Sequence, residues 1–269
     1  NTIKMANLYL DCNSIVYAAI YKIEPQCSNE TVTNEIISCV IKNIREYITI
    51  LKPTNSVLIA FDGVAPVAKL EQQRSRRFKS LYQNAVSRSI MKSTSPDAWN
   101  TTAITPGTLF MKTLDQQVKD AFNNPAEFNL TSIIFSGSCD CGEGEHKIFK
   151  HIRDNSYDHS TQNTVIYGLD ADLIMLSINH LPIAPNIYLF RETPHFIQSI
   201  NPDLEPNENY VLNIPELAKV ITLDMKNDVE LTKEEHNNCI YDYILLCFLL
   251  GNDFMPHFPA INIRTGGVD

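Results

Sequence analysis

The sequence predicts an α/β fold in which a mainly parallel, twisted sheet is flanked by helices. Short runs rich in β-branched and aromatic residues alternate with longer segments that have helical character. Strands that are separated by helices pair in parallel, because a helical crossover returns the chain to the same end of the sheet. The 269 residues are 44% hydrophobic and 20% charged, which suits a globular domain with a substantial core. We therefore expect residues 1–269 to form a single domain.

Each expected element can be placed in the sequence. Five short apolar runs are predicted strands: Leu8–Asp11, Val57–Asp62, Ser132–Ser136, Val165–Gly168 and Ile187–Arg191. Six longer segments are predicted helices: Val32–Leu51, Lys69–Arg88, Thr108–Phe122, Glu145–Ile152, Pro215–Met225 and Ile240–Leu250. Segments 93–106 and 196–213 are rich in Ser, Thr, Pro and Asn, which is typical of surface loops.

Charge is unevenly distributed along the chain. The net charge of −9 by itself disfavours a nucleic-acid partner. Between Lys69 and Lys92, however, seven cations stand against the single anion Glu71, which gives a local charge of +6. A concentrated basic patch combined with acids in apolar surroundings is typical of a metal-dependent phosphoryl-transfer enzyme.

Cysteine use and hydropathy bear on the compartment. Seven cysteines without a CxxC pair fit reduced thiols, so we expect a cytoplasmic protein, with the nucleus as the alternative. No apolar run reaches the roughly 18 residues of a membrane span, and no signal peptide is recognisable, so no membrane partner is expected. Because the chain begins with Asn1 rather than Met, we expect it to be part of a longer polypeptide.

Carboxylates stand at the ends of the predicted strands. Asp11, Asp62 and the pair Asp170 and Asp172 each follow an apolar run. Ligand sites of open α/β sheets lie beyond the carboxyl ends of the strands, so these acids can converge there. Asp170 and Asp172 are two residues apart, which in extended backbone places both side chains on one face.

Three further acids belong to the same pattern. Glu143 and Glu145 alternate with Gly142 and Gly144, and we expect the glycines to hold them in a turn that opens the next helix. Asp253 follows the last predicted helix. Hard cations such as Mg²⁺ prefer oxygen ligands, so the sequence predicts two such ions, roughly 3.5–4 Å apart, rather than zinc.

Simpler interpretations compete with the metal site. A single Asp after a strand is most often a helix cap or a turn residue, and it is the recurrence of acids beside apolar runs that favours ligands. Cys139 and Cys141 near His146 could indicate zinc, but no second pair completes a tetrahedron. We interpret His146 and His257 as structural residues.

The predicted basic helix begins seven residues after Asp62. Lys69, Gln73, Arg76 and Arg77 fall at i, i+4, i+7 and i+8, on one helical face. Three cations and an amide that converge suit a phosphate, which the guanidinium fork of Arg binds through two oxygens. A solvated charged helix is the usual interpretation of such a run, and the proximity of Asp62 favours a phosphate pocket instead.

Seven short motifs are spread over nearly the whole chain: Asn7-Leu-Tyr-Leu-Asp-Cys-Asn13, Phe61-Asp-Gly-Val-Ala-Pro66, Gln72-Gln-Arg-Ser-Arg-Arg-Phe78, Ile104-Thr-Pro-Gly-Thr108, Gly142-Glu-Gly-Glu-His-Lys147, Tyr167-Gly-Leu-Asp-Ala-Asp-Leu173 and Leu249-Leu-Gly-Asn-Asp-Phe-Met-Pro-His257. In content and in order they closely resemble the motifs of the XRN family of 5′→3′ exoribonucleases. The second and third motifs, taken together, are highly specific.

The resemblance implies a PIN-like, flap-nuclease core and assigns roles by position. Matching the catalytic, metal-binding acids of the family are Asp11, Asp62, Glu143, Glu145, Asp170, Asp172 and Asp253. Matching its pocket for a terminal 5′-monophosphate are Lys69, Gln73, Arg76 and Arg77. Where the family usually has a stacking His, this chain has Tyr17, whose ring also offers a face to the terminal base. The family's Gly-Val-Pro opening and everything after Asp269 are absent, so the resemblance implies nothing about processivity.

The activity implied by the resemblance is stepwise hydrolysis of single-stranded, 5′-monophosphorylated RNA to nucleoside 5′-monophosphates, in RNA decay. Catalysis would use two metal ions, Mg²⁺ or Mn²⁺, and a cap or a triphosphate would overfill the pocket. A structure-specific flap endonuclease would share the acids and would release oligonucleotides instead. An inactive RNA-binding scaffold is the other alternative, and lost acids would indicate it, whereas all seven are present.

Overall fold

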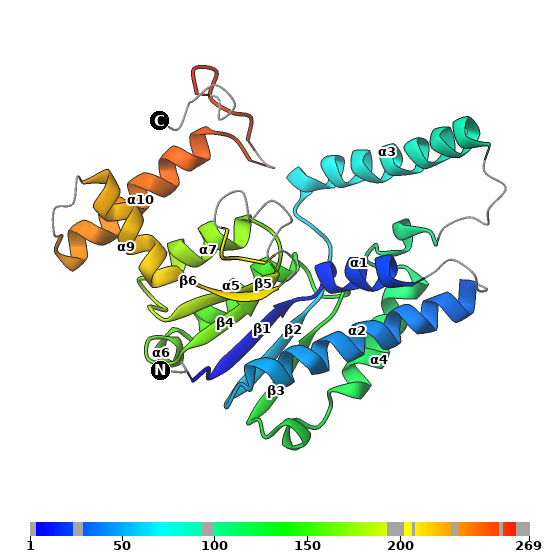
Figure 1. The fold of residues 1–269 in the computed structure, drawn as a ribbon, viewed down its shortest axis with the longest axis horizontal. Coiled ribbons are helices and arrows are strands. Elements are labelled where there is room, and N and C mark those ends of the chain that lie inside the picture. Colours follow the sequence, from blue (N-terminus) through cyan, green and yellow to red (C-terminus); the bar gives the residue numbers. More distant parts are fainter. Residues whose placement is uncertain are drawn as a thin grey trace.

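The computed structural model describes residues 4–23, 29–92, 99–192, 202–205, 208–226, 231–252 and 255–261. These residues contain a six-stranded sheet of order β3-β2-β1-β4-β5-β6 (Figure 1). The strands are β1 Asn7–Asp11, β2 Ser56–Ala60, β3 Ser132–Ser136, β4 Thr164–Tyr167, β5 Ile187–Glu192 and β6 Asn209–Asn213. The first five pair in parallel and β6 pairs antiparallel with β5, which confirms the predicted fold class.

Helices cover both faces of this sheet (Figure 1). One face is covered by α1 Asn13–Lys22, α2 Asn29–Leu51 and α4 Leu109–Ala121. The other face is covered by α5 Gly144–Asp154, α7 Asp172–His180, α9 Ile214–Met225 and α10 Lys233–Leu249. Short helical turns lie at Thr101–Ala103, Pro125–Phe128 and α6 Ser156–His159. Within the described ranges, no helix is both long and apolar enough to cross a membrane.

The central strand β1 divides the interior into two cores. Leu8 and Leu10 pack with α1, α2 and α4, whereas Tyr9 between them packs with α5 on the opposite face. This separation follows from the two-residue period of an extended chain. Because helices cover both faces, all five residues of β1 are buried, as is usual in parallel sheets. The strand therefore ends inside the molecule, and Asp11 at its carboxyl end is buried with it.

Helix α3, Val67–Met91, extends away from the sheet (Figure 1). Pro66 precedes its first turn, where its fixed φ suits a helix start. Most residues of α3 are exposed, including large apolar ones such as Phe78 and Ile90. Only its first turns approach the sheet, and those turns carry the basic residues predicted to bind phosphate.

Several sequence predictions need correction. Segment 196–213, predicted as a loop, contains the edge strand β6, whose alternating exposure gave only a weak signal between asparagines. Helix α7 begins at Asp172 and Ala171 before it already has helical backbone angles, so no extended backbone joins Asp170 to Asp172, and the prediction that they share one face of a strand is wrong. Helix α10 begins seven residues earlier than predicted, because Thr232 and Glu235 form a capping box at its start.

Candidate active site

The described acids of the predicted site lie at the carboxyl end of the sheet: Asp11, Asp62, Glu143, Glu145, Asp170 and Asp172. Asp11 is the last residue of β1, Asp62 lies two residues beyond β2, and Asp170 lies three residues beyond β4. These strands are neighbours in the sheet, so their carboxyl ends bring the three acids together. The other three acids stand at the first turns of α5 and α7.

Asp11 lies at the centre of a cluster suited to a cation. One oxygen each of Asp11, Glu145 and Asp170 lie within 4.8 Å of one another. The Oδ1 atom of Asp11 is buried and has no hydrogen-bond partner among the described residues. Gly144 faces this atom, and a Cβ at that position would lie 2.5 Å from it. A buried carboxylate oxygen without a donor is costly, and a divalent cation held by oxygen ligands would satisfy it.

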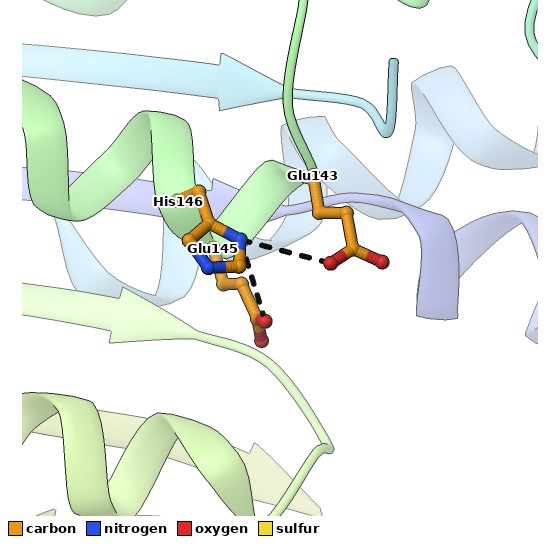
Figure 2. Close-up of side chains that lie close together, drawn as sticks. All are labelled: Glu143, Glu145 and His146. Atoms are coloured by element: carbon orange, nitrogen blue, oxygen red, sulfur yellow. Dashed lines mark ion pairs between the residues drawn. The ribbon is translucent and has the colours of Figure 1, made fainter. Parts of the chain in front are cut away.

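A second cluster adjoins the first at the start of α5. The Nδ1 atom of His146 lies 3.7 Å from Glu143 Oε2 and 3.7 Å from Glu145 Oε1 (Figure 2). Gly142 has a φ of +95°, which side chains rarely adopt, and Glu143 is the N-cap residue of α5. The alternating glycines and glutamates therefore form a turn that opens the helix, as the sequence predicted.

The crowding of carboxylates changes their acidity. Burial raises the pKa of Asp11 well above its usual value, and the charges of Asp62, Glu145 and Asp170 raise it further. Burial likewise raises the pKa of Glu145 to about 7, although the charge of Lys69 acts in the opposite direction. The pKa of Asp62 is also raised, mainly by burial. The charged forms of Asp11, Asp62 and Glu145 are therefore disfavoured in this site, and a bound cation would offset that cost.

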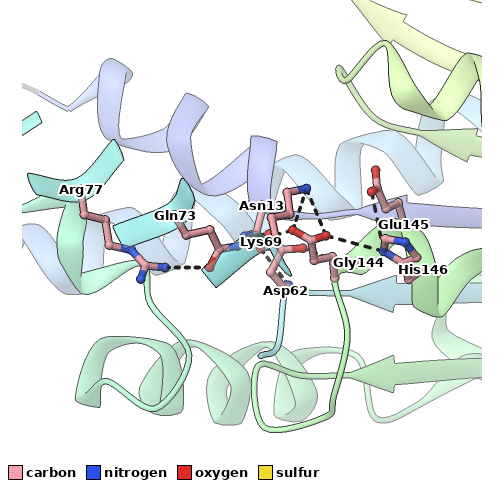
Figure 3. Close-up of polar contacts among 9 residues, drawn as sticks. Asn13, Asp62, Lys69, Gln73, Arg77, Gly144, Glu145 and His146 are labelled. Atoms are coloured by element: carbon pink, nitrogen blue, oxygen red, sulfur yellow. Dashed lines mark hydrogen bonds and ion pairs between the residues drawn. The ribbon is translucent and has the colours of Figure 1, made fainter. Parts of the chain in front are cut away.

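Asp62 is held by hydrogen bonds to both of its carboxylate oxygens (Figure 3). The side chain of Asn13 donates to Asp62 Oδ2 at 2.6 Å, and its Oδ1 accepts from the Asp62 amide at 3.0 Å. The backbone amide of Gly144 donates to Asp62 Oδ1 at 2.7 Å. Asn13 and Gly144, the first residues of helices α1 and α5, thus fix the orientation of the Asp62 side chain.

The loops that follow β2 and β3 are interlocked. The amide of Gly63 donates to the Gly142 carbonyl at 2.9 Å, and the amide of Gly142 donates to the Val64 carbonyl at 3.1 Å. A Cβ at Gly63 would lie only 1.6 Å from the backbone oxygen of Asp140, so only glycine permits this approach. The two loops carry Asp62 and Glu143, whose relative placement depends on this contact.

The inner turns of α3 connect the basic helix to the acids. Lys69 Nζ lies 2.9 Å from Glu143 Oε1 and donates to Oε2 at 3.1 Å. Gln73 donates to Glu143 Oε1 at 3.5 Å, and Arg77 donates to Gln73 Oε1 at 3.5 Å (Figure 3). These three residues form a row that leads from the acids along the helix. Arg76, predicted for the same face, is exposed on α3.

Tyr17 lies on α1, one helical turn beyond Asn13, and is 41% exposed. Burial raises the pKa of its phenol, and the nearby positive charge of Arg77 acts in the opposite direction. Tyr17 therefore stands on the side of α1 that faces the basic row, with part of its ring accessible.

Two other parts of the sequence interpretation can be placed. Asp253, the seventh predicted acid, lies outside the described residues. Cys139 and Cys141 are exposed free thiols, and neither joins a potential metal-binding cluster within the described part of the chain. The zinc alternative gains no support from these residues.

The sequence interpretation missed four residues at this end of the sheet. Asn13 holds Asp62, and the ring of His146, interpreted as structural, lies beside two glutamates. Lys147 and Arg191 donate to backbone carbonyls next to Asp62 and Asp170. Asn13 and Lys147 lie inside motifs, which was the available signal, whereas no pattern singled out Arg191.

Comparison with known proteins identifies the family of the chain. Residues 1–193 match the family model described as XRN 5′-3′ exonuclease N-terminus, and residues 233–269 match that of the Xrn1 helical domain. Among solved structures, the catalytic core of Rad2 in complex with DNA substrate aligns with a TM-score of 0.47 and 15% identity, covering 98% of this chain and 60% of that one. A likeness that distant does not bear on the fold.

Curated relatives named 5′-3′ exoribonuclease match nearly the whole chain. Exoribonuclease 1 of Saccharomyces cerevisiae is 34% identical, over 97% of this chain and 18% of the relative. Exoribonucleases 1 and 2 of Schizosaccharomyces pombe are 32% and 30% identical, over 97% and 100% of this chain and 21% and 31% of the relatives. The chain thus spans less than a third of the length of these relatives. Its match over residues 1–193 shows that the chain belongs to the XRN 5′-3′ exonuclease family.

Proposed function

We propose that the chain is the catalytic core of a 5′→3′ exoribonuclease that hydrolyses 5′-monophosphorylated RNA to nucleoside 5′-monophosphates. The observation that carries the proposal is the contact between Lys69 and Glu143. It joins the row of residues that we propose to bind the phosphate directly to the acid cluster. A terminal phosphate bound along this row would place the first phosphodiester of the strand beside the acids.

The acids fit divalent cations. Carboxylate oxygens converge at Asp11, Glu145 and Asp170, and the buried Oδ1 of Asp11, which has no hydrogen-bond partner among the described residues, suits contact with a cation. We propose that these acids, together with Asp62, Glu143, Asp172 and Asp253, hold two Mg²⁺ or Mn²⁺ ions. The chemistry that such ions supply is activation of the attacking water and stabilisation of charge on the leaving 3′ oxygen.

The chain's own residues select and orient the strand. Arg77 and Lys69 supply positive charge for the terminal phosphate, and Gln73 between them supplies an amide. Arg76 contributes from the neighbouring position on α3. The accessible part of the Tyr17 ring suits stacking on the terminal base, which tolerates any sequence. We propose that this row takes a single phosphate, so a cap or a triphosphate would bind poorly.

The test is degradation of three RNAs that differ only at the 5′ end: monophosphate, hydroxyl and cap. The proposal predicts rapid conversion of the monophosphate substrate to mononucleotides. Arg77→Ala removes a charge-assisted fork, worth roughly 1.5–3 kcal/mol, so the preference for monophosphate over hydroxyl should fall by roughly ten- to a hundredfold. Arg74→Ala is the matched control, because Arg74 is exposed and pairs with Glu71.

Two outcomes would contradict the proposal. Oligonucleotide products would indicate a structure-specific flap endonuclease, which shares the acids. Equal slowing of both substrates by Arg77→Ala would make α3 a general backbone binder. The same assay with DNA of the same sequence defines sugar preference. We also propose that the enzyme acts in RNA decay in the cytoplasm or nucleus, where its six described free thiols would stay reduced.

A further inference from the structure

Two half-buried cations bind the backbone next to the acids rather than the acids themselves. Lys147 on α5 donates from Nζ to the carbonyl oxygens of Phe61 and Gly137, each at 2.7 Å. Phe61 immediately precedes Asp62. Gly137 begins the loop that follows β3 and leads to Glu143. The ammonium group therefore ties together two loops that carry acids of the site.

Arg191 makes the corresponding contact on the other side of β1. It lies near the end of β5, which pairs with β4 so that Phe190 stands opposite Tyr167. From there its guanidinium donates to the carbonyl oxygen of Leu169 at 2.7 Å. Leu169 immediately precedes Asp170. Within the described residues, this is the one side-chain hydrogen bond made to the loop of residues 168–171.

We infer that Lys147 and Arg191 are positioning residues that fix the peptide groups before Asp62 and Asp170, and thereby set the cation affinity of the site. The inference rests on the proposed function. An acid whose preceding peptide is fixed keeps its carboxylate aimed at the cluster without a metal ion. Partners of ligands that act in this way typically change metal affinity or activity by roughly 10- to 100-fold when they are removed.

The acid next to the Lys147 contact has further hydrogen-bond partners, whereas the acid next to the Arg191 contact does not among the described residues. Asp62 is also held by Asn13 and the amide of Gly144. Asp170 has no such side-chain support among the described residues. The loss of Arg191 should therefore weaken cation binding more than the loss of Lys147.

Loss of the positive charge alone and loss of the positioning contact should change the Mg²⁺ affinity in opposite directions, so the sign of the change tests the inference. A cation near the site repels Mg²⁺, so removing its charge should strengthen Mg²⁺ binding if only long-range electrostatics mattered. Removing a positioning contact should weaken Mg²⁺ binding, because the acids lose their arrangement. The direction of the change separates the two effects.

The experiment compares Arg191→Met, Lys147→Met and Arg45→Met with the unaltered chain. Each change keeps the aliphatic stem and removes the charged donor. Arg45 is the matched control: it donates to the Ala121 carbonyl at 3.0 Å and lies over the ring of Phe122, at a contact between α2 and α4. Two quantities are measured for each chain: the rise in melting temperature with Mg²⁺ concentration, relative to that chain without Mg²⁺, and the Mg²⁺ concentration that half-saturates hydrolysis.

For Arg191→Met we expect the Mg²⁺ concentration at half-effect to rise roughly 10- to 100-fold in both measurements, with a smaller rise for Lys147→Met. Arg45→Met should lower the melting temperature without changing either Mg²⁺ dependence. Arg191→Lys, which keeps a shorter donor, should recover part of the affinity and keeps the test decisive if Arg191→Met does not fold. Unchanged or tighter Mg²⁺ binding in the Arg191 variants would overturn the inference. Absence of any Mg²⁺ effect on the unaltered chain would instead contradict the proposed function.

Discussion

At the amino end of the central strand β1, Asn7 is buried among neutral partners, whereas at its carboxyl end Asp11 is buried among other carboxylates. Asn7 accepts hydrogen bonds from Asn55 and Ser56 and donates to Gln162 and Thr164. Both polar atoms of its side chain are thus satisfied within the protein. Asp11, only four residues later, has a raised pKa and a side-chain oxygen without a hydrogen-bond partner in the part of the chain that the structure describes.

The contrast between Asn7 and Asp11 indicates which buried polar residues of this fold contribute to stability and which contribute to function. A buried polar group that its neighbours fully satisfy contributes to the stability of the folded chain. A buried charge that its neighbours repel destabilises the folded chain, and it persists because it binds something from outside. The two ends of one strand should therefore respond in opposite ways to the same kind of substitution.

The largest expected effect comes from Asp11→Asn, which keeps the shape of the side chain and removes its charge. Hydrolysis of 5′-monophosphorylated RNA should fall by roughly a thousandfold or more, since metal chemistry supplies several kcal/mol of transition-state stabilisation. Without Mg²⁺, the variant should melt at the same temperature or higher, because repulsion with its acidic neighbours is relieved. Turnover assays and thermal unfolding in a chelator measure the two effects. An Asp11→Asn variant that is active, or that is strongly destabilised without Mg²⁺, would contradict the view that Asp11 serves function at the expense of stability.

A substitution at the other end should have the reverse outcome. Asn7→Ala removes the acceptor of the Ser56 hydroxyl and the donor to the Thr164 hydroxyl in the interior, at a cost of roughly 1–3 kcal/mol. Unfolding in urea should show that loss at an unchanged slope. Turnover per folded molecule, measured well below the melting temperature, should stay near that of the unaltered chain. A strong loss of turnover without loss of stability would mean that the amino end also shapes the site.

The smallest expected effect is the pH dependence of the stabilisation by Mg²⁺, which tests the acid cluster at the carboxyl end of β1. The pKa of Glu145 is raised from 4.5 to about 7 in the folded chain. The folded chain therefore binds this proton more tightly than the unfolded chain, and the resulting stabilisation is fully present below about pH 4.5. That contribution is lost as pH rises from about 4.5 through about 7. Mg²⁺ competes with the same protons, so the rise in melting temperature caused by Mg²⁺ should grow between about pH 6 and about pH 8. In Asp11→Asn the rise should be small at every pH, and a pH-independent rise in the unaltered chain would contradict the assignment.

The pattern of apolar runs was enough to predict the parallel sheet and the convergence of its acids. Strand ends are marked locally, by a buried run that stops at a carboxylate, and parallel pairing then brings such ends together. The alternating glycines around Glu143 predicted a turn for the same reason, since the needed backbone conformation is a local property.

What could not be predicted depends on contacts between distant residues. Arg191 donates to a backbone carbonyl 22 residues away, a partner that no side-chain pattern specifies. The sequence Leu169-Asp-Ala-Asp172 could continue a strand or open a helix, and only the packing of α7 decides between them. Asn13 was visible within a motif, but its pairing with Asp62 requires β1 and β2 to be neighbours.

The interlocked loops that follow β2 and β3 also bear on how the site opens. Because the amides of Gly63 and Gly142 are bonded across the two loops, displacement of either loop breaks both hydrogen bonds. The pair forms one unit of local unfolding, so both amides should exchange hydrogen for deuterium at a common rate. Opening of either loop would therefore disturb the relative placement of Asp62 and Glu143 in the same event.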